Sequence, residues 1–386
     1  MQLQSLTIFK RLEEDALVRA LLAYRAEKTD RRYAELVAAI FRANAQENVA
    51  SYVADLVLRD ENAFSVTAAA KKTPSSHAVF AMKHDLLLLY ELLFFLQPSD
   101  FFAVLPPKKL FYGNWGNQET VTALSAYYAA NGYGIWLGHA AFRFEGNISP
   151  VDTLSPIRLS DLKGYVREKE IVGDNILSFL TALPFSNMLL YGDRGTGKSS
   201  TVHAMLNEYA PMGLRLVELP KEHLTELAAL RKKLSAIPLK FIVFIDDLSL
   251  EENDPQISTL KAALEGSVTD ASDNIMIVAT TNRRHIVRES FAERENSVHA
   301  SDQLEEQLSL SDRFGLSVYF ATTGKLEYLD IVRRLADDME LNYDRDALCA
   351  LAERWALLKG GRSPRRAKQF VQLACAYVSQ GKEIRI

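Results

Sequence analysis

The residues best suited to chemistry lie in a glycine-rich stretch near the middle of the 386-residue chain, MLLYGDRGTGKSS at 188–200. Positions 192–199 match the pattern G-x-x-x-x-G-K-[ST], in which glycines let backbone amides surround phosphate oxygens at a helix N-terminus. We expect Lys198 to reach the β and γ phosphates of a nucleotide and the Ser199 hydroxyl to occupy a Mg²⁺ position. The residues that this loop would bring to the phosphates are Gly192, Asp193, Arg194, Gly195, Thr196, Gly197, Lys198, Ser199 and Ser200.

Two adjacent acids follow an apolar run in the segment FIVFIDDLS. A strand over this run would deliver Asp246 to the carboxyl edge of a sheet, beside the glycine-rich loop, where its carboxylate can hold Mg²⁺ directly or through water. Asp247, the next residue, is suited to polarise an attacking water. A solvated strand end could carry the same two acids, but the neighbouring phosphate pattern favours a metal and water site.

Apolar runs in the second half of the chain predict the elements that position these residues. The runs recur between helical stretches, and each is continuously apolar instead of alternating. Continuous runs are typical of strands that are covered on both faces, as in a parallel sheet between helices. We therefore expect an α/β fold of three layers with a five-stranded parallel sheet, its strands at 188–191, 214–219, 241–245, 275–279 and 316–320.

Helical spacing of apolar residues dominates on both sides of this α/β segment. It occurs at 11–60, 79–96 and 118–130 in the first part of the chain and at 325–380 in the last. The stretch 146–160 holds two prolines and several turn residues, which are typical of a boundary. The expected domains are a mainly helical one at 1–150, the α/β nucleotide-binding one at 151–323 and a small helical one at 324–386.

Composition and charge exclude several other classes of protein. Hydrophobic residues make up 48% of the chain and charged residues 24%, as in ordinary globular proteins and unlike disordered ones. Residues 1–150 hold 15 basic and 15 acidic side chains, and subtraction from the totals of 45 and 49 leaves 30 and 34 for the rest. Neither part is therefore a polyelectrolyte-binding tail, and a general affinity for nucleic acid is not indicated.

The cysteines, the histidines and the longest apolar run predict no further chemistry. Cys349 and Cys375 lie in apolar helical segments, and we expect buried thiols in a reducing compartment. The spacing of His285 and His299, near Glu305 and Glu306, fits no zinc pattern, so we prefer a polar helix or an interface loop there. The run DLLLLYELLFFLQP is too short and too polar to span a bilayer, and the first residues lack a signal-peptide pattern, so we expect a cytoplasmic protein.

Motifs that accompany the glycine-rich loop resemble those of the AAA+ ATPases. VATTN ends the fourth apolar run, SLSDRFG precedes the fifth, and GGRSPRRAKQF lies in the last helical region. The resemblance implies that Asn282 orients the attacking water, that Arg313 is an arginine finger for a neighbouring subunit's nucleotide, and that Arg365 reaches the γ phosphate from a C-terminal helical lid. LSDLKGYVREKEIV resembles the stretch that encloses the adenine, with Leu162 and Gly164 as contacts.

A closer resemblance, over residues 131–378, is to the uncharacterised AAA+ family known as domain of unknown function 815. It rests on LLYGDRGTGKSS, FIDDLSLE, TTNRRH and EEQLSLSDRFGL, which occur in this order. Most AAA+ proteins carry Glu where this chain has Asp247. Because the Asp side chain is one methylene shorter, we expect slow hydrolysis, with Asn282 helping to hold the water.

These residues together predict a Mg²⁺-dependent ATPase that binds and hydrolyses ATP, forms a homo-oligomer (a ring or a dimer) and uses its N-terminal domain to remodel or regulate a protein partner. Two alternatives stay open: a nucleotide-gated scaffold with little hydrolysis, and a nucleic-acid-associated loader, against which the neutral N-terminal half argues. The side chains expected to carry the reaction are Lys198, Asp247, Asn282, Arg313 and Arg365, and those expected to hold the metal are Ser199 and Asp246.

Overall fold

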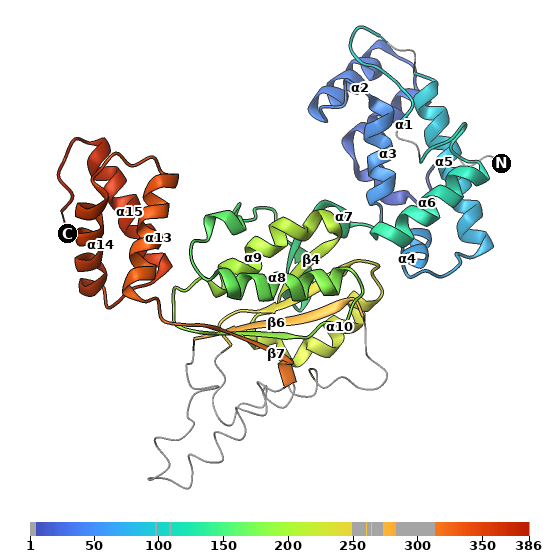
Figure 1. The fold of residues 1–386 in the computed structure, drawn as a ribbon. Coiled ribbons are helices and arrows are strands. Elements are labelled where there is room, and N and C mark those ends of the chain that lie inside the picture. Colours follow the sequence, from blue (N-terminus) through green and yellow to red (C-terminus); the bar gives the residue numbers. More distant parts are fainter. Residues whose placement is uncertain are drawn as a thin grey trace. The chain divides into compact units, whose positions relative to one another are not determined.

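A computed structural model describes residues 5–96, 99–107, 110–248, 260, 264, 273–282 and 313–385 (Figure 1). The chain divides into two compact units. The first comprises Met1–His139 with Ala236–Leu239, and the second comprises Ala140–Ser235 with Lys240–Ile386.

The first unit is built of helices whose starts are set by polar caps. Asp15, Asn48, Asn62 and Asn117 each accept hydrogen bonds from first-turn amides, which have no partner inside the helix. These caps divide the long helical periodicity of the sequence into shorter helices. They are η1 (Lys10–Glu14), α1 (Ala16–Ala26), α2 (Asp30–Arg42), α3 (Val49–Arg59), α4 (Ala63–Ala69), α5 (Ser76–Phe94), α6 (Gln118–Asn131) and α7 (Ile135–Gly138).

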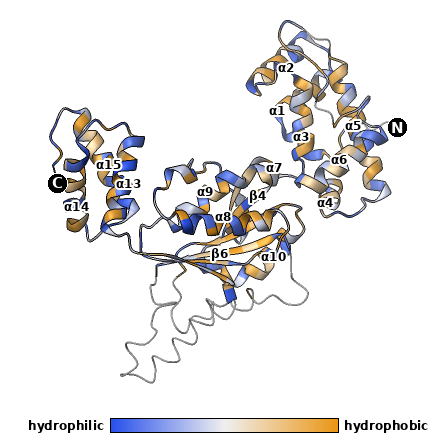
Figure 2. Ribbon diagram, in the orientation of Figure 1, coloured by the Kyte–Doolittle hydropathy of each residue, from blue (hydrophilic) through white to orange (hydrophobic). Residues whose placement is uncertain are grey.

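One hydrophobic core holds these helices together. Phe9, Phe64, Trp115 and Tyr128 are among its largest fully buried side chains. Figure 2 shows apolar and polar residues on the same helices of this unit. In α2 and α3 the apolar residues gather on one side of the helix, so packing of that side leaves the polar side to solvent.

Helix α5 contains the longest apolar run of the sequence and one fully buried carboxylate, Asp85. This carboxylate accepts hydrogen bonds from the amide and hydroxyl of Thr7 (2.7 and 2.9 Å) and from the amide of Phe9 (3.0 Å). It also lies 2.9 Å from Nδ1 of His84. Within the described ranges, we find no helix whose length and apolar character would let it cross a membrane.

A seven-stranded sheet forms the centre of the second unit, in the order β2-β1-β4-β5-β6-β3-β7. The five expected strands lie next to one another and pair in parallel, in the order β4-β5-β6-β3-β7. Every residue of β3 and β6 is buried, as continuous apolar runs predict. The strands are β1 (Ala141–Glu145), β2 (Asn147–Pro150), β3 (Met188–Gly192), β4 (Leu214–Glu218), β5 (Lys240–Ile245), β6 (Ile275–Thr281) and β7 (Leu316–Phe320).

Two further strands, β1 and β2, join the sheet. The apolar residues and turn glycines of 131–147 predict one or two strands in this region, but the expected five-stranded sheet did not include them. β1 pairs in parallel with β4, Ala141 opposite Leu216, and turns through Gly146 into the antiparallel β2. β1 buries Phe142 and Phe144 and exposes the residues after each of them, which is the alternating pattern of an edge region and not of a covered strand. Both strands belong to the second compact unit, which begins at Ala140.

Helices cover both faces of the sheet, which gives the expected three layers. Figure 1 shows α8 (Val166–Leu180) and α9 (Lys198–Tyr209) on one face and α10 (Leu227–Ser235) on the other. Ile176 of α8 and Met205 of α9 share a core with Leu190, Phe244 and Val278 of the strands. Short turns of 3-10 helix complete the unit at η2 (Leu159–Asp161), η3 (Ala210–Met212) and η4 (Lys221–Glu226).

The last three helices of the second unit have a hydrophobic core of their own. They are α13 (Lys325–Asp338), α14 (Arg345–Leu358) and α15 (Pro364–Ser379). Tyr328, Leu348 and Phe370, one from each helix, are fully buried in that core. Ser363 caps α15 by accepting from the amide of Arg366, and Pro364 occupies the first helical position, where its missing N–H costs nothing. We call these three helices the lid.

Candidate nucleotide-binding site

The glycine-rich loop joins the buried strand β3 to helix α9. Gly192 ends the strand with a φ of 129°, and a Cβ atom there would lie 2.1 Å from the backbone oxygen of Phe320. Gly195 and Gly197 also have positive φ angles, of 78° and 100°. Because α9 begins at Lys198, the amides of its first turn lack intrahelical acceptors and can bind an anion.

Lys198 is buried, with 6% of its surface exposed, and oxygen atoms surround its ammonium group. Nζ donates to the backbone oxygens of Gly192 (2.9 Å) and Asp193 (2.8 Å) and to Oδ1 of Asn282 (3.0 Å). Burial lowers the pKa of Lys198 to about 8, while nearby carboxylates, that of Asp193 first, act in the opposite direction. The ammonium is thus held at the loop and has a reduced affinity for its proton.

Ser199 and Asp246 lie in contact at the carboxyl edge of the sheet, although β6 separates β5, which precedes Asp246, from β3, which precedes the loop. Ser199 Oγ donates to Asp246 Oδ1 at 2.6 Å, and Thr280 Oγ1 donates to the same oxygen at 2.6 Å. Hydroxyl and carboxylate oxygens are the ligands that Mg²⁺ prefers, and Mg²⁺ sites commonly take one or two of them from the protein and the rest from phosphates and water. The donor set therefore fits Mg²⁺.

Asp247 and Asn282 are joined by a hydrogen bond next to this pair. Asn282 Nδ2 donates to Asp247 Oδ1 at 2.7 Å, so the amide of Asn282 links Asp247 on one side to Lys198 on the other. The Asp247 amide donates to Thr280 Oγ1 at 2.9 Å, and its φ is 51°, a left-handed conformation. The strand order explains the contacts: β5, which precedes Asp247, pairs with β6, which precedes Asn282.

The remaining residues of the loop have different surroundings. Asp193 Oδ2 accepts a hydrogen bond from Thr322 Oγ1 at 2.5 Å, and the Thr196 hydroxyl donates to the backbone oxygen of Asp193 at 2.9 Å. Arg194 is exposed. The hydrogen bond between Asp193 and Thr322 thus links the loop to the segment that follows β7.

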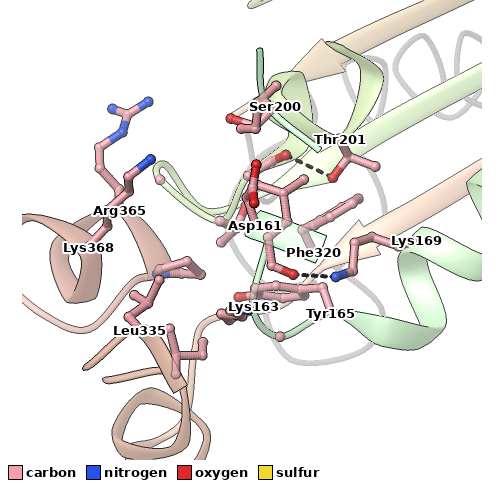
Figure 3. A pocket seen from close by; sticks show the side chains of 18 residues that line it. Asp161, Lys163, Tyr165, Lys169, Ser200, Thr201, Phe320, Leu335, Arg365 and Lys368 are labelled. Atoms are coloured by element: carbon pink, nitrogen blue, oxygen red, sulfur yellow. Dashed lines mark hydrogen bonds between the residues drawn. The ribbon is translucent and has the colours of Figure 1, made fainter. Parts of the chain in front are cut away.

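A cavity of about 220 Å³ lies beside the loop. Leu162, Gly164, Ser200 and Arg365, which the sequence predicts to be nucleotide contacts, all line it. Figure 3 shows the ring of Tyr165 and the side chain of Leu335 at one end and Ser200 at the other. Apolar side chains at one end and amides of a glycine-rich loop at the other match the two halves of a nucleotide.

The lid contributes one wall of this cavity. The Arg365 amide donates to the backbone oxygen of Gly195 at 3.2 Å, which brings the start of α15 to the glycine-rich loop. Lys163 forms an ion pair with Asp338 of α13 at 2.6 Å. A Cβ atom on Gly164 would lie 3.0 Å from the Ile331 side chain, so the segment before α8 also packs closely against the lid.

Arg313 lies away from these residues. It precedes β7, which pairs in parallel with β3, so that Leu316 is opposite Met188 and Phe320 is opposite Gly192. The glycine-rich loop leaves the sheet at the Gly192 end, and Arg313 belongs to the other end, one strand length or about 16 Å away. The structure therefore does not bring Arg313 to the loop of its own chain.

Several residues of the site were not predicted from the sequence, of which Thr280 is the clearest. This buried hydroxyl connects Asp246 to the Asp247 amide, and its place in VATTN, two residues before Asn282, was the available signal. Tyr165 was also missed. Its hydroxyl donates to the backbone oxygen of Ala321 at 2.6 Å, and burial raises its pKa to about 12. No local sequence pattern predicts the contact between Tyr165 and Ala321, because the two residues lie far apart in the chain.

The metal alternative considered for the histidine-containing segment lies outside the described residues, because His285, His299, Glu305 and Glu306 are not among them. In the part of the chain that is described, no group of three or more His, Cys, Asp or Glu side chains is arranged to hold a metal ion. The cysteines are both free thiols, with Cys349 buried.

Comparisons with known proteins give one family. The model of the family described as "Protein of unknown function (DUF815)" matches residues 138–377. A comparison with curated proteins finds no match. Similar solved structures include the Thermotoga maritima RuvB Holliday junction branch migration motor (18% identity, 60% of this chain and 68% of that one, TM-score 0.42) and the Aeropyrum pernix Orc1 protein in complex with DNA (18%, 58% and 63%, TM-score 0.41).

Proposed function

We propose that this chain, which belongs to the protein family of unknown function DUF815, is a Mg²⁺-dependent AAA+ ATPase of the cytoplasm that binds and hydrolyses ATP as an oligomer. The family match includes all seven strands. One observation carries the proposal. The hydrogen bonds of Asn282 connect Lys198, a phosphate-binding group, to Asp247, a water-binding group, beside the contact of Ser199 with Asp246.

Both Mg²⁺ and groups of the chain would contact the phosphates. Mg²⁺, held by Ser199 Oγ and the Asp246 carboxylate, would supply positive charge at the β and γ phosphates. Lys198 would exchange its present oxygen partners for phosphate oxygens, and the amides of the first turn of α9 would donate to others. Burial of Lys198 supports this role, since an ammonium in a low-dielectric site interacts strongly with an anion.

Asp247 and Asn282 would orient the attacking water. Asp247 Oδ1 already accepts from Asn282, which leaves Oδ2 as the atom that would accept from water. Arg365, at the start of α15, would bind the γ phosphate from the lid, as its amide contact with Gly195 supports. Hydrolysis is proposed to be slow, because the Asp247 side chain is shorter than the Glu that most AAA+ proteins carry.

Arg313 is proposed to act on the nucleotide of a neighbouring subunit. Its place at the sheet edge remote from its own loop supports this, because one chain cannot bring Arg313 and Lys198 to the same phosphate. An arginine finger contributes about 10³ to 10⁵ in rate. Both Lys198→Ala, which weakens ATP binding, and Arg313→Ala, which keeps it, are therefore expected to lower the ATPase rate at least about 10³-fold.

Mixing these two inactive variants tests the shared site. A Lys198→Ala subunit offers an intact Arg313 to an Arg313→Ala subunit that still binds ATP, so we expect the mixture to recover part of the wild-type rate. Arg354→Ala, an exposed arginine on α14, is the matched control and should keep full activity. A mixture as inactive as its components would contradict action across subunits, and full activity of Arg313→Ala would contradict any catalytic role.

The same assays separate the alternative functions. A nucleotide-gated scaffold would hold ATP in a monomer without turnover, and a nucleic-acid-associated loader would show DNA binding that falls steeply with salt. Wild-type protein that neither hydrolyses ATP nor assembles when ATP is added would therefore favour the scaffold.

We further propose that the first unit binds the protein partner that hydrolysis remodels or regulates. Phe80 and Phe101 support this, since 74% and 52% of their surfaces are exposed. Asp247→Asn in ATP should accumulate the assembled state with its partner bound. If the first unit is the docking part, Phe80→Ser in the same background should lose the partner and retain ATP; retention of the partner would contradict this assignment.

A further inference from the structure

The nucleotide cavity has two ends of different chemistry and one acid between them. The loop glycines and Ser200 form one end, and Tyr165, Phe320 and Leu335 form the other. Figure 3 shows Asp161 between Ser200 and Thr201 on one side and the aromatic rings on the other. If the loop takes the phosphates, as the proposed function holds, the apolar end takes the base and the middle of the cavity takes the sugar.

The Asp161 carboxylate can accept more hydrogen bonds than the one it has in the structure. Its Oδ2 accepts from the Arg158 amide at 2.8 Å, which closes the turn at η2. In the described part of the chain, Oδ1 has no hydrogen-bond partner and the carboxylate forms no ion pair. A carboxylate can only accept hydrogen bonds, and it accepts several at once. Asp161 lines the cavity and is exposed, so its carboxylate is available to a hydrogen-bond donor that enters the cavity.

Contacts on both sides of Asp161 hold it in place. Asn207 Nδ2, on helix α9, donates to the backbone oxygens of Ser155 and Ile157 at 2.8 Å each. On the other side, Lys169 Nζ donates to the backbone oxygen of Leu162 at 2.5 Å. The segment that carries Asp161 is thus tied to α9, the helix that follows the phosphate-binding loop, and to α8.

The sugar of a ribonucleotide offers hydroxyl donors at the 2′ and 3′ positions. A carboxylate that accepts from a ribose hydroxyl is a known way for nucleotide sites to recognise the sugar, as in dinucleotide-binding folds. We propose that Asp161 binds the ribose hydroxyls and makes the site selective for ribonucleotides over 2′-deoxynucleotides. This inference rests on the proposed function, since it needs the cavity to bind a nucleoside triphosphate.

The test is to measure dissociation constants of wild-type protein and variants for ATP, 2′-deoxy-ATP and 3′-deoxy-ATP in Mg²⁺. Hydrogen bonds to charged groups contribute enough for a preference of about tenfold for ATP over at least one deoxynucleotide. Asp161→Ala should bind ATP about tenfold more weakly and show no preference. Asp161→Asn keeps an oxygen for the Arg158 amide and should show a reduced preference in a correctly formed turn. Glu170→Ala, an exposed acid on α8, should behave like wild type.

The outcomes separate three explanations. Equal binding of all three nucleotides by wild-type protein would overturn the ribose contact. Equal weakening of all three by Asp161→Ala, with the preference kept, would also overturn it and assign Asp161 to the turn alone. If wild-type protein binds none of them and Lys198→Ala behaves identically, the proposed function itself fails, and the ribose contact fails with it.

Discussion

The two units differ in the hydrogen-bond partners of their buried charged groups. In the first unit, Asp85 is fully buried and accepts hydrogen bonds from backbone and hydroxyl groups of one short segment, residues 7–9. In the second unit, Lys198 is nearly as buried, but its partners belong to the glycine-rich loop and to the end of another strand. Both groups avoid the cost of burial without a partner.

The difference lies in whether the partners can be exchanged. The donors to Asp85 are held by the surrounding core, so its bonds serve to attach the first residues to α5. The acceptors of Lys198 lie at the open carboxyl edge of a sheet, where a phosphate can replace them. Burial of a charged group is therefore no sign of function by itself, and the position of its partners separates a structural charge from a binding one.

The largest expected effect comes from Gly192→Ala, which tests whether the strand end at the site tolerates any side chain. A Cβ atom there meets the backbone oxygen of Phe320 at 2.1 Å, and β3 cannot move away without losing β7. We expect a loss of more than about 4 kcal/mol in the free energy of unfolding of the second unit, measured by urea unfolding followed by far-UV circular dichroism.

Gly146→Ala is the matched control for this change. Gly146 also has a positive φ, of 76°, but a Cβ atom there would meet no atom within 4 Å. It should cost only the conformational penalty of about 1–2 kcal/mol. Equal losses for the two variants would mean that φ, and not the contact with Phe320, limits Gly192.

An intermediate effect is expected from Asp85→Ala in the first unit. Removing the carboxylate leaves the buried Phe9 amide without its acceptor and frees the amide and hydroxyl of the exposed Thr7 to water, so the free energy of unfolding reported by Trp115 should fall by about 2 kcal/mol. ATP affinity should not change. Glu91→Ala on the same helix removes only an exposed ion pair with Arg25 and should cost less than about 1 kcal/mol. Weaker ATP binding by folded Asp85→Ala would contradict the assignment of a purely structural role to Asp85.

The smallest effect is the pH dependence of ATP binding, which sharpens the description of Lys198. Burial lowers the pKa of this ammonium to about 8, against the pull of Asp193, Asp247 and Asp246, so the free protein begins to lose the proton as the pH rises through 8. A triphosphate needs the protonated form and will raise the pKa again. Affinity should thus be nearly constant below about pH 7, fall as the pH rises through 8, and approach a loss of about tenfold per pH unit above that.

Titration calorimetry between pH 7 and 9.5 measures this dependence. Lys198→Ala should bind weakly and without the inflection near pH 8. An inflection that persists in Lys198→Ala would assign it to another group.

The sequence predicts the parallel strands and the adjacency of Ser199 and Asp246 because both follow from local patterns. A continuously apolar run is covered on both faces, and parallel strands bring their carboxyl ends to one edge. The same reasoning does not predict the β1–β2 hairpin as part of the sheet. Buried and exposed residues alternate in β1, and β2 is a polar four-residue strand whose proline suggests a boundary. Contacts such as that of Tyr165 with Ala321 depend on tertiary packing and have no local signal.

The left-handed backbone at Asp247 has a consequence for the choice of variants. Asp and Asn adopt such a φ more readily than other side-chain-bearing residues, while a longer acid adopts it less readily. Replacement by Asn therefore alters the charge and preserves the turn, whereas replacement by Glu preserves the charge and strains the turn. At this position the chemically conservative exchange is the structurally disruptive one, and the neutral amide is the cleaner probe of what the negative charge does.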